Sequence, residues 1–134
     1  MHRWISFDRI FDGYEIHTNA AVDIEGGSIA DLAVSSNVKV QGHINGLLTP
    51  GFVDLQVNGG GGVLFNTTPT LQGIQAIADA DRSFGTTSLM PTVISDSPDV
   101  LEQAADAAVA ARNDRGVIGI HICLLYTSPS PRDS

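Results

Sequence analysis

Residues 51–122 alternate between short apolar runs with a period of two and longer stretches with a period of 3.6. This alternation constrains the fold more than any other feature, because it reads strand, helix, strand, helix, strand, and each helix has one apolar stripe. The pattern predicts an α/β fold with parallel strands joined by right-handed crossovers. In such folds the chemistry takes place at the carboxyl ends of the strands.

The first predicted strand is an apolar run that we expect to be buried. Asp54, Gln56 and Asn58 occupy alternate positions in it, so their side chains share one face, with Gln56 and Asn58 nearest the carboxyl end. Glycines at residues 59–62 let the backbone turn sharply and approach another group, because they lack a Cβ. The same residues would also suit satisfied polar groups and a plain turn. His121 is expected at the matching end of the third strand.

The two predicted helices begin at similar signals. Thr68-Pro69 and Ser97-Pro98 each resemble a capping residue followed by a first-turn proline, and Gly85 is expected to end the first helix. The predicted apolar stripes are Leu71, Ile74, Ile77, Ala78 and Phe84 in the first helix, and Leu101, Ala104, Ala105, Ala108 and Val109 in the second. The second strand is expected at residues 86–94, with Pro91 near a strand end or an irregularity, and the third at residues 117–122.

Residues 1–48 carry the signals of a small β-unit. We expect four or five short antiparallel strands, with a hairpin turn at Glu25-Gly26-Gly27. The expected apolar runs are residues 4–7, 15–17, 21–24, 29–34 and 38–40, followed by residues 42–46. Such a unit buries little surface by itself, so we expect it to pack on the rest of the chain.

Composition excludes several classes of function. The formal net charge is −8 and the chain has only 7 Lys and Arg, which argues against nucleic acid or an anionic membrane as a partner. Cys123 is the single cysteine, so the sequence predicts neither an internal disulfide nor a cysteine-based zinc site. No apolar run reaches the length of a membrane span, and no signal-peptide pattern opens the chain. A cytoplasmic location is therefore expected.

Three strings in the chain, PGFVDLQVNGGGGVLFN, FGTTSLMPTVIS and GVIGIHI, closely resemble the first half of bacterial N-acetylglucosamine-6-phosphate deacetylases, members of the amidohydrolase superfamily. The resemblance covers residues 1–122. It implies that residues 50–122 are the first three strands and two helices of a (β/α)8 barrel, and that residues 1–49 are part of a small β-domain. A complete barrel needs eight strands and about 250 residues, so the barrel is expected to be incomplete.

The resemblance also implies a function. Members of the family remove the acetyl group from N-acetylglucosamine 6-phosphate, giving acetate and glucosamine 6-phosphate, with one divalent metal, commonly zinc. Gln56 and Asn58 stand where two-metal members of the superfamily carry His-x-His. The resemblance makes Gln56, Asn58, Gly59, Gly60 and His121 neighbours of the active site. It implies a sugar phosphate as substrate and a homo-oligomer for the full-length enzyme, whose catalytic aspartate and two metal-binding histidines lie beyond residue 122.

The resemblance ends at Cys123, which stands where the family has its metal-binding glutamate. Residues 123–134, which begin CLLYTSPSPRD, resemble one reading frame of a sequencing adapter, so we expect a non-native tail. No catalytic residue and no metal ligand is assigned, and the chain itself is expected to be inactive and without a tightly bound metal. A natural variant with Cys123 as a soft metal ligand is the alternative to the adapter.

Two other functions stay open. One is another amidohydrolase, such as a cyclic amidase or a dipeptidase, although the missing His-x-His argues against it. The other is a self-contained α/β binding module without catalysis, which a monomeric, cooperatively melting chain would favour. His2, His17 and His43 lie in the β-unit, where surface or hydrogen-bonding roles are expected.

Overall fold

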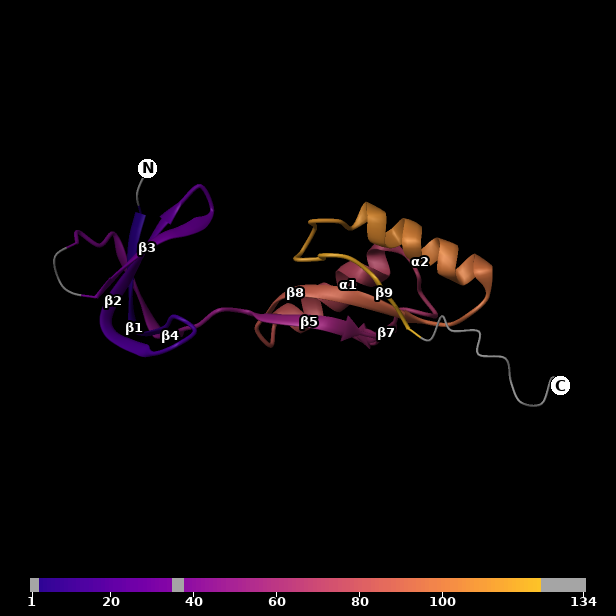
Figure 1. Ribbon diagram of the computed structural model, residues 1–134, viewed down its shortest axis with the longest axis horizontal. Coiled ribbons are helices and arrows are strands. Elements are labelled where there is room, and N and C mark those ends of the chain that lie inside the picture. The colour runs from indigo at the N-terminus through magenta and orange to yellow at the C-terminus, as the bar shows by residue number, and fades with distance from the viewer. Residues whose placement is uncertain (1–2, 35–37, 124–134) are drawn as a thin grey trace. The chain divides into compact units, whose positions relative to one another are not determined.

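The computed structural model of the chain describes residues 3–34 and 38–123 (Figure 1). The chain divides into two compact units, Met1–Pro50 and Gly51–Ser134. Each unit has its own sheet and its own apolar cluster. The predicted tail falls almost wholly on residues 124–134, which lie outside the described residues. Its non-native origin therefore stays a prediction.

The first unit is a four-stranded sheet in the order β3-β2-β1-β4. Its strands are β1 (Arg3–Phe11), β2 (Ile16–Glu25), β3 (Ser28–Val34) and β4 (Gly42–Leu48). The predicted hairpin between β2 and β3 is confirmed, with Gly26 and Gly27 both at positive φ, as a two-residue turn between right-twisted strands requires. Ile10, Ala20 and Val22 form the buried centre of the unit.

The expectation of a wholly antiparallel unit was wrong. Strand β4 pairs with β1 in parallel, with Ile5 opposite Gly42 and Ile10 opposite Leu48. The separate runs at residues 15–17 and 21–24 belong to one strand, β2. The run at residues 38–40 is not a strand, whereas the glycine-containing segment after it forms β4.

The second unit confirms the predicted alternation of strands and helices. Three parallel strands lie in the order β5-β8-β9, joined through two helices. The elements are β5 (Phe52–Val57), β6 (Gly59–Gly60), β7 (Val63–Leu64), α1 (Leu71–Arg82), β8 (Thr86–Ile94), α2 (Pro98–Ala110) and β9 (His121–Cys123). Neither α1 nor α2 has the length and hydropathy needed to cross a bilayer, as far as the described residues go.

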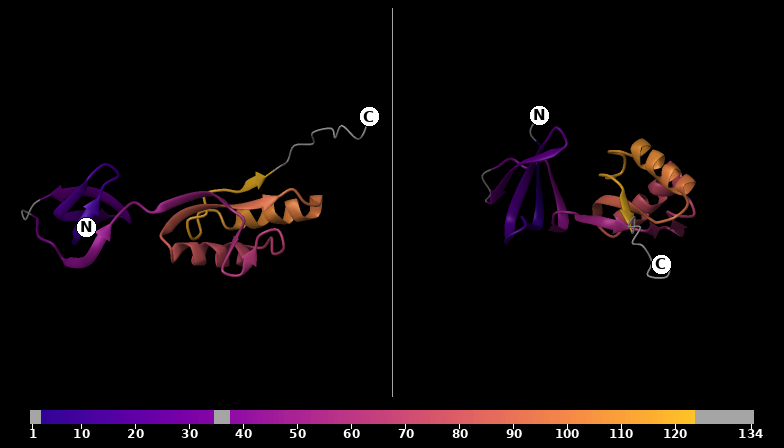
Figure 2. Two further views of the ribbon diagram at one scale, coloured as in Figure 1. Left: turned by 90° about the horizontal axis from the view of Figure 1, so that it is seen from below. Right: turned by 45° about the vertical axis from the view of Figure 1, so that its right-hand side comes forward.

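Both helices run alongside the central strand β8 and pack on one of its faces (Figures 1 and 2). Leu89 and Val93, which point to the same side of β8, join Ile74 and Ile77 of α1 and Ala104 of α2 in one cluster. All five are essentially inaccessible to solvent. Burying side chains the size of Leu or Ile stabilises a fold by about 1.5–3 kcal/mol each, so this cluster is the main support of the second unit.

The helix boundaries agree only in part with the predictions. Helix α2 begins at Ser97 and Pro98, as expected. Helix α1 begins after Thr70 instead of Thr68, because the hydroxyl of Thr70 accepts a hydrogen bond from the backbone N–H of Gly73. It ends at Ser83 rather than Gly85.

The predicted apolar stripes each contain one wrong member. Phe84 follows the end of α1 and is exposed. On α2 Val109 is exposed, and Ala107 and Ala111 are buried in its place. An alanine-rich helix gives a weak amphipathic signal, so the sequence did not correctly predict which face of α2 is buried.

Strand β5 is not buried, contrary to expectation. Phe52, Val53 and Leu55 expose 68%, 60% and 57% of their surface, and only Val57 joins the core. The reason is its place at the edge of the three-stranded sheet, where one side of the strand has no neighbour among the described residues.

The third strand is shorter than predicted. Val117 makes only an isolated bridge with Leu89, and regular pairing with β8 begins at His121. Pro91 lies inside β8 opposite Val57, where the pairing of β5 and β8 changes register. The expected irregularity at this proline is therefore confirmed.

Candidate functional site

The carboxyl ends of the parallel strands bring two of the predicted residues to one level of the sheet. Asn58 follows Val57, whose partner on β8 is Pro91, and the next residue of β8, Thr92, is paired with His121 on β9. Asn58 and His121 therefore lie at the same level, on either side of β8. Whether they serve a site stays a prediction.

Gln56 lies two residues before Asn58, and its backbone is tied to a neighbouring carboxylate. Asp54 Oδ1 accepts a hydrogen bond of 2.9 Å from the backbone N–H of Gln56. This contact engages one oxygen of Asp54 within its own strand, in agreement with a structural role for that residue. Gln56 itself is exposed to solvent.

The glycines after β5 form a tight hairpin against helix α1. Gly59 and Gly60 pair with Leu64 and Val63 across a turn in which both central residues, Gly61 and Gly62, have positive φ. A Cβ on Gly60 would lie 3.3 Å from the carboxylate of Asp81, and one on Gly61 would lie 3.1 Å from the carbonyl of Ala76. The glycines are thus needed for the turn and for close packing on α1.

Sequence reasoning missed Asn66, which clamps the carboxyl end of β8. Its side-chain amide donates to the carbonyl of Ile94 at 2.9 Å and to Asp96 Oδ2 at 3.0 Å, while its Oδ1 accepts from the N–H of Ile94 at 2.9 Å. The backbone N–H of Ser97, followed by the Asn66 amide, lowers the pKa of Asp96. Polar residues directly after an apolar run, at Asn66 and Asp96, were the available signal.

The same edge is tied to strand β9 through Ser95. Both the backbone N–H and the hydroxyl of Ser95 donate to the carbonyl of Cys123, each at 3.1 Å. The loop that leaves β8 is therefore held by Asn66 on one side and by the end of β9 on the other. This gives the edge a fixed shape.

The donor groups at this edge do not fit the metal that the resemblance implies. His121 and Cys123 lie at alternate positions of β9 and supply one imidazole and one thiol. Gln56 and Asn58 are neutral amides, which are poor zinc ligands beside imidazole. Cys123 stands where the resemblance predicts a glutamate. The donors present do not form the metal-binding set that the resemblance implies.

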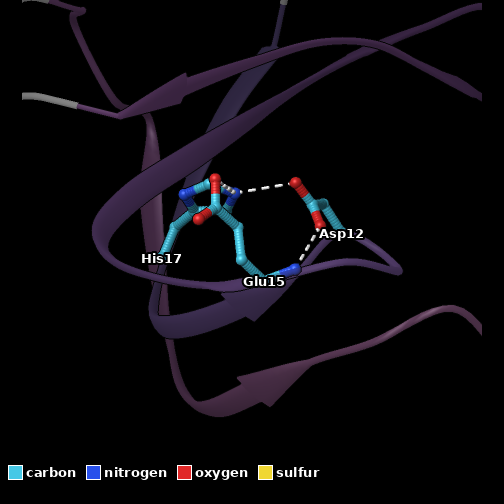
Figure 3. Close-up of side chains that lie close together, drawn as sticks. All are labelled: Asp12, Glu15 and His17. Carbon is cyan, nitrogen blue, oxygen red and sulfur yellow. Dashed lines mark hydrogen bonds and ion pairs between the residues drawn. The ribbon is translucent and has the colours of Figure 1, made fainter.

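Within residues 3–34 and 38–123, a group of three possible metal ligands occurs in the first unit instead, at the turn between β1 and β2 (Figure 3). Asp12 Oδ2 lies 2.8 Å from His17 Nε2, which is 3.9 Å from Glu15 Oε1. Asp12 Oδ1 also accepts from the backbone N–H groups of Tyr14 and Glu15. The hydrogen bond from His17, followed by these two N–H groups, lowers the pKa of Asp12 to about 2.

These hydrogen bonds explain why the three side chains lie close together: they stabilise the turn between β1 and β2. Asp12 holds the backbone of the turn with one oxygen and His17 with the other, so the hydrogen-bonding role expected for His17 is confirmed. His43 is also hydrogen-bonded, to Ser6 and Asp8.

Comparisons with known proteins give related sequences of one kind. The chain is 49% identical over 79 residues to an N-acetylgalactosamine-6-phosphate deacetylase of a Shewanella species, a match that covers 58% of this chain and 20% of the relative. It is 27% identical over 119 residues to an N-acetylglucosamine-6-phosphate deacetylase of Haemophilus influenzae, covering 84% of this chain and 31% of that protein. No protein-family model matches the chain.

Solved structures of two deacetylases have a similar fold. The N-acetylglucosamine-6-phosphate deacetylase of Pasteurella multocida superimposes with a TM-score of 0.81 at 23% identity, over 91% of this chain and 34% of its own. A variant of the Mycobacterium smegmatis enzyme, in complex with N-acetyl-D-glucosamine-6-phosphate, gives a TM-score of 0.78 at 22% identity, over 90% of this chain and 32% of that one. At such identities the similarity shows the α/β fold alone.

The matches cover from a fifth to about a third of the relatives' length. Sequence and fold together point to the N-acetylglucosamine-6-phosphate deacetylases, of which this chain corresponds to only a part.

Proposed function

We propose that this chain is part of a metal-dependent hydrolase that removes the acetyl group from an N-acetylhexosamine 6-phosphate. The products are acetate and the amino-sugar phosphate, with glucosamine 6-phosphate as the expected case. The observation that carries the proposal is the 49% identity over 79 residues to a deacetylase of this type. The fold shared with the Pasteurella multocida enzyme supports it.

The configuration of the sugar at C4 has two candidates. Most of the related deacetylases are named for N-acetylglucosamine 6-phosphate, but the relative with 49% identity is named for the galactosamine epimer. N-acetylgalactosamine 6-phosphate is therefore the second candidate substrate.

Strands β5, β8 and β9 are proposed to be the first three of an eight-stranded barrel. Three observations support this: the strands are parallel, they lie in sequence order, and β5 has an exposed apolar edge. In such a barrel the polar face with Asp54, Gln56 and Asn58 would turn inward. The alternative of a self-contained module would require β5 to be stable with that edge in water.

Amide hydrolysis needs an activated water molecule and a proton for the leaving amine. In a complete enzyme a bound divalent metal would supply Lewis acidity for the carbonyl. We propose that the metal ligands and the catalytic aspartate come from outside residues 1–122, and that Gln56, Asn58, Gly59, Gly60 and His121 border the substrate. The chain alone is then inactive. Cytoplasmic location and homo-oligomerisation of the full-length enzyme stay predictions.

A pair of chimeric enzymes tests the proposal. Residues 1–123 would replace the matching segment of the Shewanella deacetylase, either unchanged or with Cys123→Glu. We expect the Cys123→Glu chimera to release acetate from one or both sugar phosphates, and the unchanged chimera to be at least about 10²-fold slower, because one metal ligand is lost. Both sugars are offered separately, and a preference that differs from that of the unmodified Shewanella enzyme shows what residues 1–123 contribute to the choice of epimer.

Two results would contradict the proposal. One is a folded Cys123→Glu chimera that hydrolyses neither sugar phosphate. The other is release of acetate by the 134-residue chain after loading with zinc. Circular dichroism of both chimeras shows whether loss of activity comes from misfolding.

A further inference from the structure

Three polar side chains in the first unit form a hydrogen-bonded chain that the proposed deacetylase reaction does not use. Ser6 on β1 and His43 on β4 are direct partners in the parallel pairing, and Ser6 Oγ lies 2.9 Å from His43 Nδ1. On the other side of the imidazole, His43 Nε2 lies 3.2 Å from Asp8 Oδ1. Ser6 and Asp8 are two residues apart, so both point to the same face of β1.

Asp8 is fixed in place by an irregularity of the sheet. The pairing of β1 with β4 shifts between Phe7 and Arg9, and this bulge brings the backbone N–H of Gly46 to 2.7 Å from Asp8 Oδ2. Gly46 has a φ of +114°, which favours glycine at this position. The N–H of Gly46, followed by the hydrogen bond and the charge of His43, lowers the pKa of Asp8. Asp8 is thus an anion near neutral pH.

The charge of Asp8 determines which groups donate and which accept in the Ser6–His43–Asp8 network. An ionised carboxylate can only accept a hydrogen bond, so His43 Nε2 carries a hydrogen and donates a hydrogen bond to Asp8. In the neutral ring Nδ1 is then an acceptor directed at the Ser6 hydroxyl. The carbonyl of Gly42, 3.3 Å from Ser6 Oγ, is a second and longer alternative acceptor.

We propose that Ser6 is a nucleophilic serine, activated by His43 and Asp8, that accepts acyl groups from activated aryl esters. The arrangement matches the serine, base and carboxylate roles by which a hydroxyl becomes a nucleophile. His43 and Asp8 are about half exposed and Ser6 is half-buried, so a small ester can reach the hydroxyl from solvent. This inference is independent of the deacetylase proposal.

The step is a simple acyl transfer. Ser6 Oγ bonds to the acyl carbon while its proton passes to His43 Nδ1, and Asp8 stabilises the resulting imidazolium. The bond between the acyl carbon and the aryl oxygen breaks, and the phenolate leaves. His43 then returns its proton to the phenolate or to water, which leaves an O-acylated Ser6.

The test is acetylation of the full 134-residue chain by 4-nitrophenyl acetate near neutral pH, with peptide mass spectrometry to locate the acetyl group. Ser28, an exposed serine in the same sheet, is the internal reference. We expect Ser6 to react about 10²-fold faster than Ser28, the lower end of what a positioned general base contributes. His43→Gln and Asp8→Asn should each reduce this preference at least about ten-fold, and Ser6→Ala should remove the modification.

His17→Gln is the matched control, because His17 also bonds an aspartate in this unit but has no hydrogen bond to Ser6. It should leave the Ser6 preference unchanged. Equal acetylation of Ser6 and Ser28 would overturn the proposal, and so would an undiminished preference in His43→Gln. Circular dichroism identifies any variant that loses the fold, and Asp8→Asn gives a second test if His43→Gln does so.

Discussion

Asn66 is the residue with the most demanding set of contacts at the candidate site. One side chain satisfies both backbone groups of Ile94 and also reaches Asp96. No pattern rule requires an asparagine at this position, since its partners lie 28 and 30 residues away. Long-range side-chain contacts of this kind depend on how the strands are placed, and so they could not be predicted from local sequence.

Replacing Asn66 by Ala should destabilise the second unit by about 1–3 kcal/mol, because the N–H and carbonyl of Ile94 lose partners at the end of β8. Urea unfolding measures the change. Gln103→Ala, on the exposed side of α2, is the control and should stay within about 0.5 kcal/mol of the parent. Equal stability of the two variants would show that water replaces the clamp.

Asp12 should make its turn sensitive to acid. Its pKa is lowered from 3.8 to about 2 in the folded chain, mainly by the hydrogen bond from His17. A lowered carboxyl pKa stabilises the fold above the unfolded value, and this stability is lost as the pH falls from 3.8 towards 2. Asp12→Asn should flatten the fall in melting temperature across that window. Glu102→Gln, an exposed carboxylate on α2, should leave it unchanged.

The pKa of Asp81 is shifted in the direction opposite to that of Asp12. Burial, followed by the charge of Asp54, raises its pKa above 3.8. A raised carboxyl pKa gives stability that is present below the unfolded value and lost as the pH rises through the folded value. Asp81→Asn should therefore raise the melting temperature at neutral pH, with little effect in acid. A melting temperature of Asp81→Asn below that of the parent at neutral pH would contradict the prediction that the charged form of Asp81 destabilises the fold.

At the scale of elements, the helices show how far local signals reach. The Ser97-Pro98 start of α2 was predicted correctly because a capping serine and a first-turn proline coincide there. Thr68 and Thr70 both suit the cap of α1, and only the position of the Gly73 N–H decides between them. The buried face of α2 was predicted less accurately, because alanines lie on several sides of the helix.

Gly73 should resist substitution although it lies inside α1. A Cβ there would overlap the carbonyl oxygen of Thr68, a clash that no side-chain movement can relieve. We expect Gly73→Ala to destabilise the second unit by about 1–3 kcal/mol, despite the usual helical gain of about 1 kcal/mol from alanine. Gly119→Ala is the matched control, because its Cβ would meet only the end of Met90 at 3.5 Å. A Gly73→Ala chain as stable as its parent would mean that the segment before α1 shifts freely.

At the scale of the whole molecule, the alternation of strands and helices and the parallel direction of the strands were the most predictable features. Both follow from the alternation of periods. The exposure of β5 was not predictable in the same way, because burial depends on neighbours that local sequence does not specify. The parallel pairing of β4 with β1 likewise depends on how the strands are placed in space, which the residues of β4 alone do not specify.

The exposed edge of β5 should cause self-association. Phe52, Val53 and Leu55 present apolar side chains on a strand that has no neighbour on one side among the described residues, which favours strand pairing between molecules. Val53→Lys should lower the concentration-dependent mass measured by light scattering. Val109→Lys, which adds the same charge at an exposed valine on α2, should reduce it less. Equal reduction by both variants would indicate a general effect of charge.

The division into two units also separates the optical signals of the chain. Its only tryptophan, Trp4, lies on β1 in the first unit, whereas both described helices belong to the second. Indole fluorescence thus follows the first unit, and helical ellipticity near 222 nm is dominated by the second. A single denaturation recorded with both probes can then assign each transition to its own part of the polypeptide, without labels or truncation.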